Sequence, residues 1–343
     1  MIITNIFDKN EKYLLACSGG VDSIALFHLL IEKNIKFDVI TINYNFREQS
    51  KEEVKNIKEL CIKNNKKLYL HENKQKIKTN MEKEARDIRY NFFDKTMKEN
   101  NYKGLITGHN LNDRVEWFLM QLTKGAGLKE LLGMEKISYR NEYQILKPLI
   151  ETEREEIEKY IQEKKIKSFY DESNSDISYH PSKNPQGIKR NYFRHKFAKE
   201  LTKEFKNGIV KSFSILEKES KELIDYKIKK KDEITIIDLK TVNDINIVKA
   251  IDEAMKKHYK YLMSSKQREE ILNQKSKGIV IDKKAIGFIR KNKILITPYK
   301  EKSQSFSELT KEEKEYFRKN KIPAKNRIYL KKANIDLNSI VSV

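Results

Sequence analysis

A short string near the N-terminus has the residue types of a phosphate-binding loop: Ser18, Gly19, Gly20, Val21, Asp22 and Ser23. It follows an apolar run and opens an apolar helical pattern, so several backbone N–H groups should converge where a helix dipole favours negative charge. The glycines permit close backbone approach, the serines add hydroxyl donors, and Asp22 suits a metal ion or a hydroxyl. An ordinary strand-to-helix turn with a polar cap is the alternative interpretation.

A second polar group follows a later apolar run and also opens a helical pattern. The spacing of His109, Asp113 and Glu116 places the two carboxylates on neighbouring turns of one helix, pointing toward the first loop. Carboxylates beside a phosphate site can hold Mg²⁺ or accept a proton from an attacking amine. For His109 the alternative is a structural hydrogen bond.

Two arginines are further candidate site residues, but their sequence contexts are less specific. Arg47 follows the apolar run that ends near Ile42, so it can reach a phosphate while Phe46 or the backbone near Ile42 contacts an adenine. The alternative is a strand-end turn with a solvated arginine. Arg86 lies in the string EARDIRY at 84–90. That string is either a helix face with salt-bridged spacing or one that aims an arginine at the site.

The elements that must position these residues alternate along the first 150 positions or so. Strands are expected at 13–17, 37–42, 67–70, 104–107 and 143–146, and helices at 21–33, 51–64, 80–99 and 111–123. This alternation predicts an α/β fold, an open parallel five-stranded sheet with helices on both faces. Ligands bind such sheets beyond the carboxyl ends of the strands, so the polar residues should meet at one edge.

The whole chain of 343 residues is strongly basic, with a net charge of +21 and a pI near 9.5. This balance predicts a polyanionic partner, and we expect nucleic acid rather than a membrane surface, because no helical pattern sets a strongly apolar face against its lysines. No apolar stretch is long enough to span a bilayer, and we expect a cytoplasmic protein. Cys17 and Cys61 form no CxxC pair and are expected to be small core residues.

The string SGGVDS resembles the pyrophosphate-binding loop of the PP-loop ATP pyrophosphatases. Further strings resemble one branch of that superfamily, the tRNA(Ile)-lysidine synthetases: NYNFR, EARDIRY, GHNLNDRVEWFLMQLTKGAGLKELLGM, LKPLIETEREEIEKYI, DESNSD and RNYFRH. They cover most of residues 12–200, and their order and spacing are more specific than any single motif.

This resemblance implies a two-step ligase reaction that uses ATP and Mg²⁺. ATP adenylylates the 2-carbonyl oxygen of the wobble cytidine in tRNA(Ile) with a CAU anticodon and releases pyrophosphate. Free L-lysine then displaces AMP through its ε-amine, and the product is lysidine. The sequence leaves the oligomeric state open, with a homodimer among the states compatible with it.

The resemblance also implies a set of site residues, carried over motif by motif. The ATP-binding residues are Ser18 to Ser23, Ile42 and Arg47. The metal or catalytic carboxylates are Asp22 and Asp113, and the further catalytic residues are His109 and Arg86. Glu116 is expected to pair with the α-ammonium of lysine. The residues expected to contact tRNA or brace the loop are Arg190, Asn191 and Arg194.

Four segments are expected along the chain. An ATP-binding catalytic PP-loop domain covers 1–205, a helical linker 206–230, and a small α+β tRNA-binding domain 231–300. A C-terminal segment, a helix plus a basic tail, covers 301–343.

Three departures from the family pattern bear on this interpretation. Asn112 stands where the family usually has the first of two adjacent aspartates, which removes one carboxylate and puts the metal arrangement in question. The string NHGLR appears as NYNFR, and an extra loop that contains 180–187 separates DESNSD from RNYFRH.

Three other functions compete with the ligase. A tRNA thiolase generally needs a pair of reactive or cluster-binding cysteines, and this chain offers only Cys17 and Cys61. A basic RNA-binding protein with a decayed ATP site is suggested by Asn112 and opposed by the intact SGGVDS. An amide-forming or ammonia-using ligase is disfavoured by the high positive charge and the extra basic domain.

Overall fold

A computed structural model describes most of the chain: residues 6–45, 49–73, 81–140, 143–170, 178–182, 189–223, 225–274, 278–299 and 309–333. The chain divides into two compact units, Met1–Glu217 and Lys218–Val343. Each unit has its own sheet and its own apolar core.

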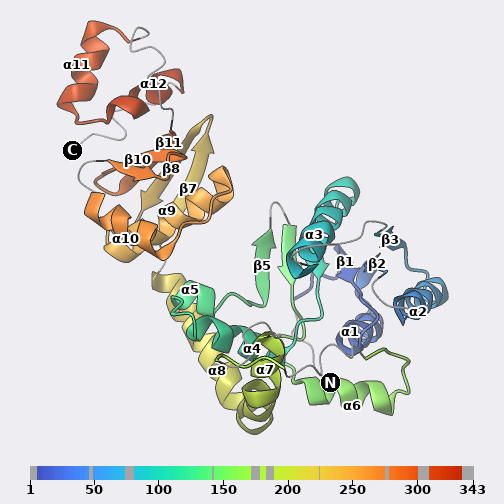
Figure 1. The fold of residues 1–343 in the computed structure, drawn as a ribbon. Helices are drawn as coiled ribbons and strands as arrows, with labels where there is room; N and C mark the ends of the chain where they lie inside the picture. The colour runs from blue at the N-terminus through green and yellow to red at the C-terminus, as the bar shows by residue number, and fades with distance from the viewer. Residues whose placement is uncertain are drawn as a thin grey trace. The chain divides into compact units, whose positions relative to one another are not determined.

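The first unit is built on a six-stranded sheet with the order β3-β2-β1-β4-β6-β5 (Figure 1). Its strands are β1 (Lys12–Ala16), β2 (Lys36–Asn43), β3 (Leu68–Glu72), β4 (Gly104–Ile106), β5 (Ile137–Arg140) and β6 (Tyr143–Leu146). The pairs among the first five strands of that order are parallel, which confirms the α/β class. The sixth strand, β5, was not expected. It pairs antiparallel with β6, and its sequence ISYR is too short to give a clear alternating signal.

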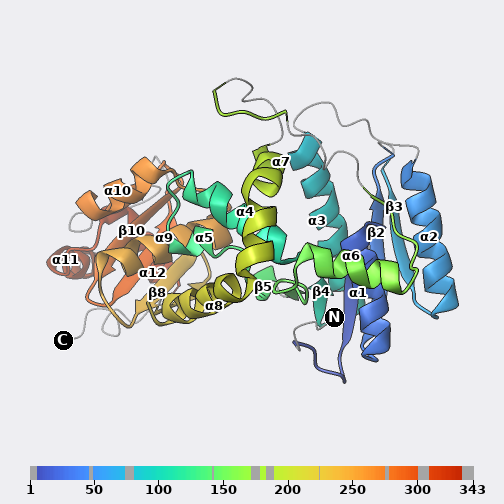
Figure 2. The same ribbon diagram turned by 90° about the horizontal axis from the view of Figure 1, so that it is seen from below.

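Helices cover both faces of this sheet because its strands are apolar on both sides. Alternate strand residues such as Tyr13 and Leu15 pack in the cluster with α1 (Val21–Glu32), α2 (Gln49–Lys63) and α6 (Arg154–Glu163). Leu14 and Ile40 point to the opposite face and pack with α3 (Met81–Asn100). Figure 2 shows α3 on one side of the strands and α2 on the other.

A helical layer completes the first unit. It consists of α4 (Leu111–Leu122), α5 (Leu128–Leu131), α7 (Lys189–Phe193), a π-helical segment η2 (Arg194–Ala198) and α8 (Lys199–Leu223). Val115, Leu132, Ala198 and Phe213 form the apolar cluster between them. The helical periodicity extends in sequence to about residue 227, but α8 ends at Leu223 and the next strand begins at Tyr226.

The second unit is a five-stranded antiparallel sheet with helices, in agreement with the smaller α+β domain expected. Its order is β7-β8-β11-β10-β9, with β7 (Tyr226–Lys231), β8 (Ile234–Leu239), β9 (Ile279–Ile281), β10 (Ala285–Arg290) and β11 (Lys293–Pro298). Its helices are α9 (Asp244–Tyr259), α10 (Ser265–Gln274), α11 (Lys311–Lys319) and α12 (Ala324–Lys332). Strand β7 was not expected, because the lysines of its sequence YKIKKK obscure the alternation of apolar and polar residues. Helix α10 was not expected either.

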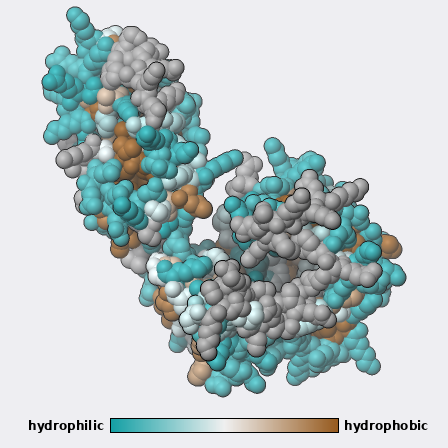
Figure 3. All heavy atoms as spheres, viewed as in Figure 1, coloured by the Kyte–Doolittle hydropathy of each residue, from teal (hydrophilic) through white to brown (hydrophobic). Residues whose placement is uncertain are grey.

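Two further expectations concern the surface and the cysteines. Within the described residues, the structure contains no helix with the length and apolar character needed to cross a membrane. The face seen in Figure 3 is mostly hydrophilic, with apolar residues in scattered patches. Cys17 and Cys61 are both buried and free, which confirms that they are core residues.

Candidate active site

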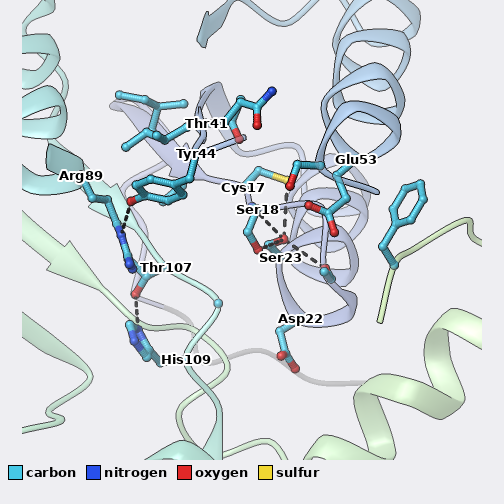
Figure 4. A pocket seen from close by; sticks show the side chains of 18 of the residues that line it. Cys17, Ser18, Asp22, Ser23, Thr41, Tyr44, Glu53, Arg89, Thr107 and His109 are labelled. Carbon is cyan, nitrogen blue, oxygen red and sulfur yellow. Dashed lines mark hydrogen bonds between the residues drawn. The ribbon is translucent and has the colours of Figure 1, made fainter. Parts of the chain in front are cut away.

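A pocket of about 470 Å³ opens at the carboxyl ends of β1, β2 and β4 (Figure 4). The structure brings to it most of the residues predicted from the sequence: Ser18, Gly20, Asp22, Ser23, Ile42, His109, Asp113, Arg190 and Arg194. They come from the loop after β1, the end of β2, the loop after β4, α4, and the α7–η2 segment. The convergence at one sheet edge is the one expected for parallel strands.

The loop between β1 and α1 is held in shape by Ser23. Its hydroxyl donates to the carbonyl oxygen of Gly20 at 3.0 Å and accepts from the backbone N–H of Ser18 at 3.2 Å. Figure 4 shows Cys17, Ser18 and Ser23 close together, with the hydrogen bonds of Ser23 as dashed lines. Because the hydroxyl of Ser23 serves the loop itself, its first role is to shape the loop and its second to line the pocket.

Helix α1 begins at the pocket with open N–H groups. Its N-cap residue, Gly20, provides no side-chain cap, so the first N–H groups of the helix are available to an anion. Gly19 has a φ of +89°, and a Cβ there would lie 2.9 Å from the Cβ of Glu53. Phe169 pairs with this loop through its N–H, which donates to the carbonyl oxygen of Gly19 at 3.2 Å. Val21 is the first residue of α1 and packs against the core instead of lining the pocket.

Gly108 is a residue of the pocket that sequence analysis did not single out. A Cβ at Gly108 would lie 3.2 Å from the backbone nitrogen of Ser23 and 3.4 Å from the Cβ of Asp22. The loop after β4 therefore approaches the start of α1 as closely as a residue without a side chain allows. The glycine directly before His109 in the string TGHN was the available signal.

Asn110 connects the two carboxylates predicted to hold a metal. It forms a capping box with Asp113 at the start of α4, and its Nδ2 donates to Oδ1 of Asp22 at 3.0 Å. Arg154 lies on the other side of Asp22, with Nη1 3.3 Å from Oδ2. Burial raises the pKa of Asp22 to about 6, and Asp113 acts in the same direction while Arg154 opposes it.

Asp113 is engaged by an arginine. Nη2 of Arg190 donates to Oδ1 of Asp113 at 2.5 Å. Burial alone would raise the pKa of Asp113, but the cationic Arg190 outweighs it with help from the N–H of Asn110 and from Arg194, and the pKa is below its usual value. Asp113 therefore stays ionised.

The structure gives Glu116 a different role from the one expected. Its carboxylate is 1% exposed, and both of its oxygens accept from guanidinium groups, Nε of Arg190 at 2.7 Å and Nε of Arg194 at 2.7 Å. It is also not among the residues that line the pocket. A carboxylate so enclosed and paired is not placed to receive the α-ammonium of lysine, so we correct that assignment.

The same ion pairs favour one of the two roles expected for the RNYFRH string, the bracing role. Arg190 and Arg194 line the pocket and bind Asp113 and Glu116, so they brace the site from within. Asn191 is buried, and Nη1 of Arg194 lies 3.5 Å from its Oδ1, so it too has a bracing contact. Sequence reasoning could not see these pairs because their partners lie more than 70 residues apart.

His109 is neutral and makes a local hydrogen bond. Its Nδ1 lies 2.9 Å from Oγ1 of Thr107, as Figure 4 shows. Burial lowers the pKa of His109 to about 4, although Asp113 acts in the opposite direction. The side chain lines the pocket in its uncharged form, where it can donate or accept a hydrogen bond without carrying charge.

The arginine that helix α3 presents to the pocket is Arg89 and not the predicted Arg86. Nε of Arg89 donates to the hydroxyl of Tyr44 at 3.2 Å, and that hydroxyl donates to the carbonyl oxygen of Ala85 (Figure 4). Arg86 lies over the ring of Tyr90, 5.0 Å from its centre, and does not line the pocket. The predicted Arg47 lies outside the described residues.

Asn112, the departure from the family's pair of aspartates, does not face the pocket. Its Nδ2 donates to Oγ1 of Thr202 at 2.8 Å, and its Oδ1 accepts from the N–H of Arg154 at 3.0 Å. It joins α4 to α8 and to the start of α6. The substitution therefore removes no carboxylate from the pocket.

The donor set fits a Mg²⁺ ion that is held together with a substrate. Among the described residues there is no group of three or more metal-ligating side chains. Asp22 and Asp113 nevertheless both accept hydrogen bonds from Asn110, and both line the pocket. Mg²⁺ is usually bound through one or two carboxylates plus phosphate oxygens, so two carboxylates beside an open helix N-terminus suit it.

Comparison with known proteins shows to which family this chain belongs. A family model described as a PP-loop domain matches residues 2–201. The tRNA(Ile)-lysidine synthase of Campylobacter jejuni strain RM1221 is 39% identical over 97% of this chain and 96% of its own length. The chain belongs to the tRNA(Ile)-lysidine synthase family. The Wolinella succinogenes member is 34% identical over 96% of this chain and 95% of its own, and the Helicobacter pylori 26695 member is 41% identical over 63% and 60%.

Membership of the tRNA(Ile)-lysidine synthase family extends beyond the strings that suggested it. Those strings end near residue 200, whereas the matches to the C. jejuni and W. succinogenes members cover nearly the whole chain. The second unit is therefore part of the similarity to these synthases.

Proposed function

We propose that this chain is an ATP-dependent ligase that joins L-lysine to C2 of the wobble cytidine of tRNA(Ile) with a CAU anticodon. The observation that carries the proposal is the uncapped N-terminus of α1 beside Asp22 and Asp113 in a chain of this family. The curated relatives are named for this product and substrate, and the PP-loop match indicates ATP.

The first step forms a bond between the 2-carbonyl oxygen of the cytidine and the α-phosphorus of ATP. The bond between the α-phosphorus and its bridging oxygen breaks, and pyrophosphate leaves with the electron pair. The open N–H groups of α1 and the helix dipole stabilise the charge that builds up on the leaving group. Gly108 and Gly19 keep the loop close enough for backbone contact.

The second step forms a bond between the ε-nitrogen of lysine and C2. The bond between C2 and its oxygen breaks, and AMP leaves with that oxygen and the electron pair. The amine must lose a proton before or during its attack. Asp113 has a lowered pKa and a contact with Arg190, so its carboxylate is better suited to orient a cationic amine or hold a cation than to act as a strong base. We therefore assign it an orienting role.

Asp22 and Asp113 are the residues proposed to hold Mg²⁺. When bound, Mg²⁺ would neutralise negative charge on the phosphates and on the departing pyrophosphate. Asn110 orients both carboxylates toward this task, through Nδ2 to Asp22 and through its N–H to Asp113. The neutral His109 adds no competing positive charge.

The tRNA partner agrees with the strongly basic composition. A net charge of +21 supplies many contacts to backbone phosphates, whose contribution to affinity weakens with salt. A cytoplasmic location, a homodimer and the four-segment division of the chain stay predictions. Sedimentation of the purified chain would test the homodimer.

Incorporation of labelled lysine tests the function. Purified chain, ATP, Mg²⁺ and labelled L-lysine should label a tRNA(Ile) transcript with a CAU anticodon, with one AMP and one pyrophosphate released per lysine. The matched control is the same transcript with a GAU anticodon, which has no wobble cytidine and should stay unlabelled. Normal tRNA binding without any incorporation would exclude the ligase and favour the RNA-binding alternative.

A further inference from the structure

One wall of the pocket is aromatic and apolar. Helix α3 presents Tyr90 and Phe93 to the pocket, with their ring centroids 5.9 Å apart in an edge-to-face arrangement. Ile40 and Ile42 from the end of β2 line the pocket too, and all four residues belong to the same apolar cluster or pack against it. A wall of this kind, beside a polar phosphate cradle, suits the flat ring of a nucleobase.

Tyr90 is held by guanidinium groups from two elements. Arg86, one turn earlier on α3, has its guanidinium carbon 5.0 Å from the centre of the Tyr90 ring. Arg140, at the end of β5, has its guanidinium carbon 4.3 Å from that centre. Cation–π contacts at these distances fix an aromatic ring most firmly when the cation itself cannot move.

Arg140 is fixed in this way by Asp94. Nε and Nη2 of Arg140 donate to the two carboxylate oxygens of Asp94, both at 2.9 Å. The hydroxyl of Tyr143 donates to the same carboxylate at 2.6 Å. A bidentate pair sets the plane of the guanidinium as well as its position, so the group over Tyr90 has a defined orientation.

These contacts connect the antiparallel edge strand β5 to the pocket through Tyr90. Asp94 and Tyr90 lie one turn apart on α3, and Arg140 joins them from β5. Neither Arg140 nor Asp94 lines the pocket. We propose that Arg140 and Asp94 are positioning residues that hold Tyr90 in the pocket wall, where its ring contacts the nucleobase of a bound substrate.

The inference rests on the proposed function, because that reaction brings two nucleobases to the pocket: the adenine of ATP and the cytosine of the wobble nucleotide. The shared chemistry is a planar, partly apolar ring. A change in the KM for ATP alone would assign Tyr90 to the adenine, and a change in the KM for tRNA alone would assign it to the cytosine.

A double-mutant cycle tests the positioning role. Arg140→Ala should raise the KM for one of the two substrates by about three- to tenfold and change kcat by less than about twofold, as expected for loss of a fixed cation–π contact. In a Tyr90→Ala background the same substitution should have no further effect, because residues that act through one another are not additive. A role of Arg140 in folding alone would give equal effects in both backgrounds and overturn the proposal.

Two conservative variants and one control complete the experiment. Arg140→Lys keeps the charge but cannot form the fork with Asp94, and Asp94→Asn removes the charge that orients it, so each should reproduce the KM effect while thermal unfolding stays close to that of the parent. Tyr139→Ala is the control. Tyr139 is the neighbour of Arg140 on β5, is 75% exposed, and accepts a hydrogen bond from Gln144, so both KM values should be unchanged.

Direct binding separates this inference from the proposed function. Dissociation constants for ATP and for the tRNA, measured without lysine, should show the same dependence on Arg140 and Tyr90. If lysine is never incorporated but ATP binding weakens in Arg140→Ala, the positioning role stands and the lysine ligase does not. If Arg140→Ala, Arg140→Lys and Asp94→Asn leave both dissociation constants and both KM values unchanged, the positioning role is wrong.

Discussion

The pocket has two polar walls that are built on different principles. The wall at α1 uses backbone groups and small residues, with Gly19 and Gly108 making room for close approach. The second wall uses charged side chains: Arg190 and Arg194 are paired to Asp113 in the pocket and to Glu116, which does not line the pocket itself. The first should fail when volume is added, whereas the second should fail when charge is removed. The difference separates steric from electrostatic control within one site.

The largest effect is expected from Asp113→Ala, which removes a charge from the second wall. Turnover should fall by about 1,000-fold or more because the cation and the amine lose their orienting group. The affinity for tRNA should be nearly unchanged. Single-turnover lysine incorporation and a filter-binding titration measure the two quantities. Weakened tRNA binding with full turnover would move Asp113 out of the site.

Glu116→Ala should be the next largest change, and its effect should be on stability. The substitution leaves Arg190 and Arg194 without the carboxylate that both of them bind, and breaking a buried ion pair costs about 3 kcal/mol. Urea unfolding should show this loss. Glu116→Gln is the control, because it keeps the shape and one acceptor oxygen and should lose less. Full stability in both variants would show that the charge of this wall is not what holds it.

The first wall is tested by adding a methyl group at one of two glycines. Gly19 and Gly125 both have a positive φ, of +89° and +70°, but only a Cβ at Gly19 meets another residue, Glu53. Gly19→Ala should weaken ATP binding by about tenfold, whereas Gly125→Ala should show only the backbone strain, about 1 kcal/mol of stability. Calorimetric ATP titrations of the two variants make the comparison. Equal affinities would leave the steric account of this wall without support.

A smaller effect should follow from pH, through Asp22 where the two walls meet. Its folded-state pKa of about 6 is above the ordinary aspartate value of 3.8, so the stabilisation from protonation is fully present below the unfolded pKa and is lost as pH rises through 6. Asp22→Asn should therefore gain stability relative to the parent between pH 5 and 8, on the order of 1 kcal/mol. Urea midpoints of both proteins at each pH measure it. The binding of ATP with Mg²⁺ to the parent should weaken below pH 6.

The smallest effect is expected from Asn112→Asp, which restores the family's pair of aspartates. Asn112 donates to Thr202 and accepts from the N–H of Arg154, and it does not line the pocket. An aspartate keeps the second hydrogen bond and loses the first, so its cost should fall on stability and not on turnover. Turnover and ATP affinity should change by less than about threefold. A large gain of activity would show that Asn112 does limit the cation site.

The sequence predicted those parts of the site that depend on neighbours along the chain. The SGGVDS loop follows a buried strand and opens α1, so the sequence alone places Ser18, Gly20, Asp22 and Ser23 at the pocket. The parallel strands were predicted because each is a short, mostly apolar run followed by a helical pattern. The antiparallel β5 is four residues long and gave no such signal.

The parts that were missed depend on helix phase or on distant partners. Arg86 and Arg89 differ by three positions on α3, and only the packing of that helix decides that Arg89 faces the pocket. Glu116 was predicted to bind lysine because its ion-pair partners, Arg190 and Arg194, are more than 70 residues away in sequence and the sequence does not show that they pair with it.

The contact between Phe169 and the loop at Gly19 has a consequence for how the chain matures. The loop is among the first segments to be synthesised, yet it is completed by Gly108 and Asn110, then Arg154, and finally Phe169, about 150 residues later. Closing a loop of this length costs entropy that the contact itself must offset. A nascent chain that ends before residue 169 therefore carries the complete SGGVDS motif without the backbone partner that its loop has in the folded protein.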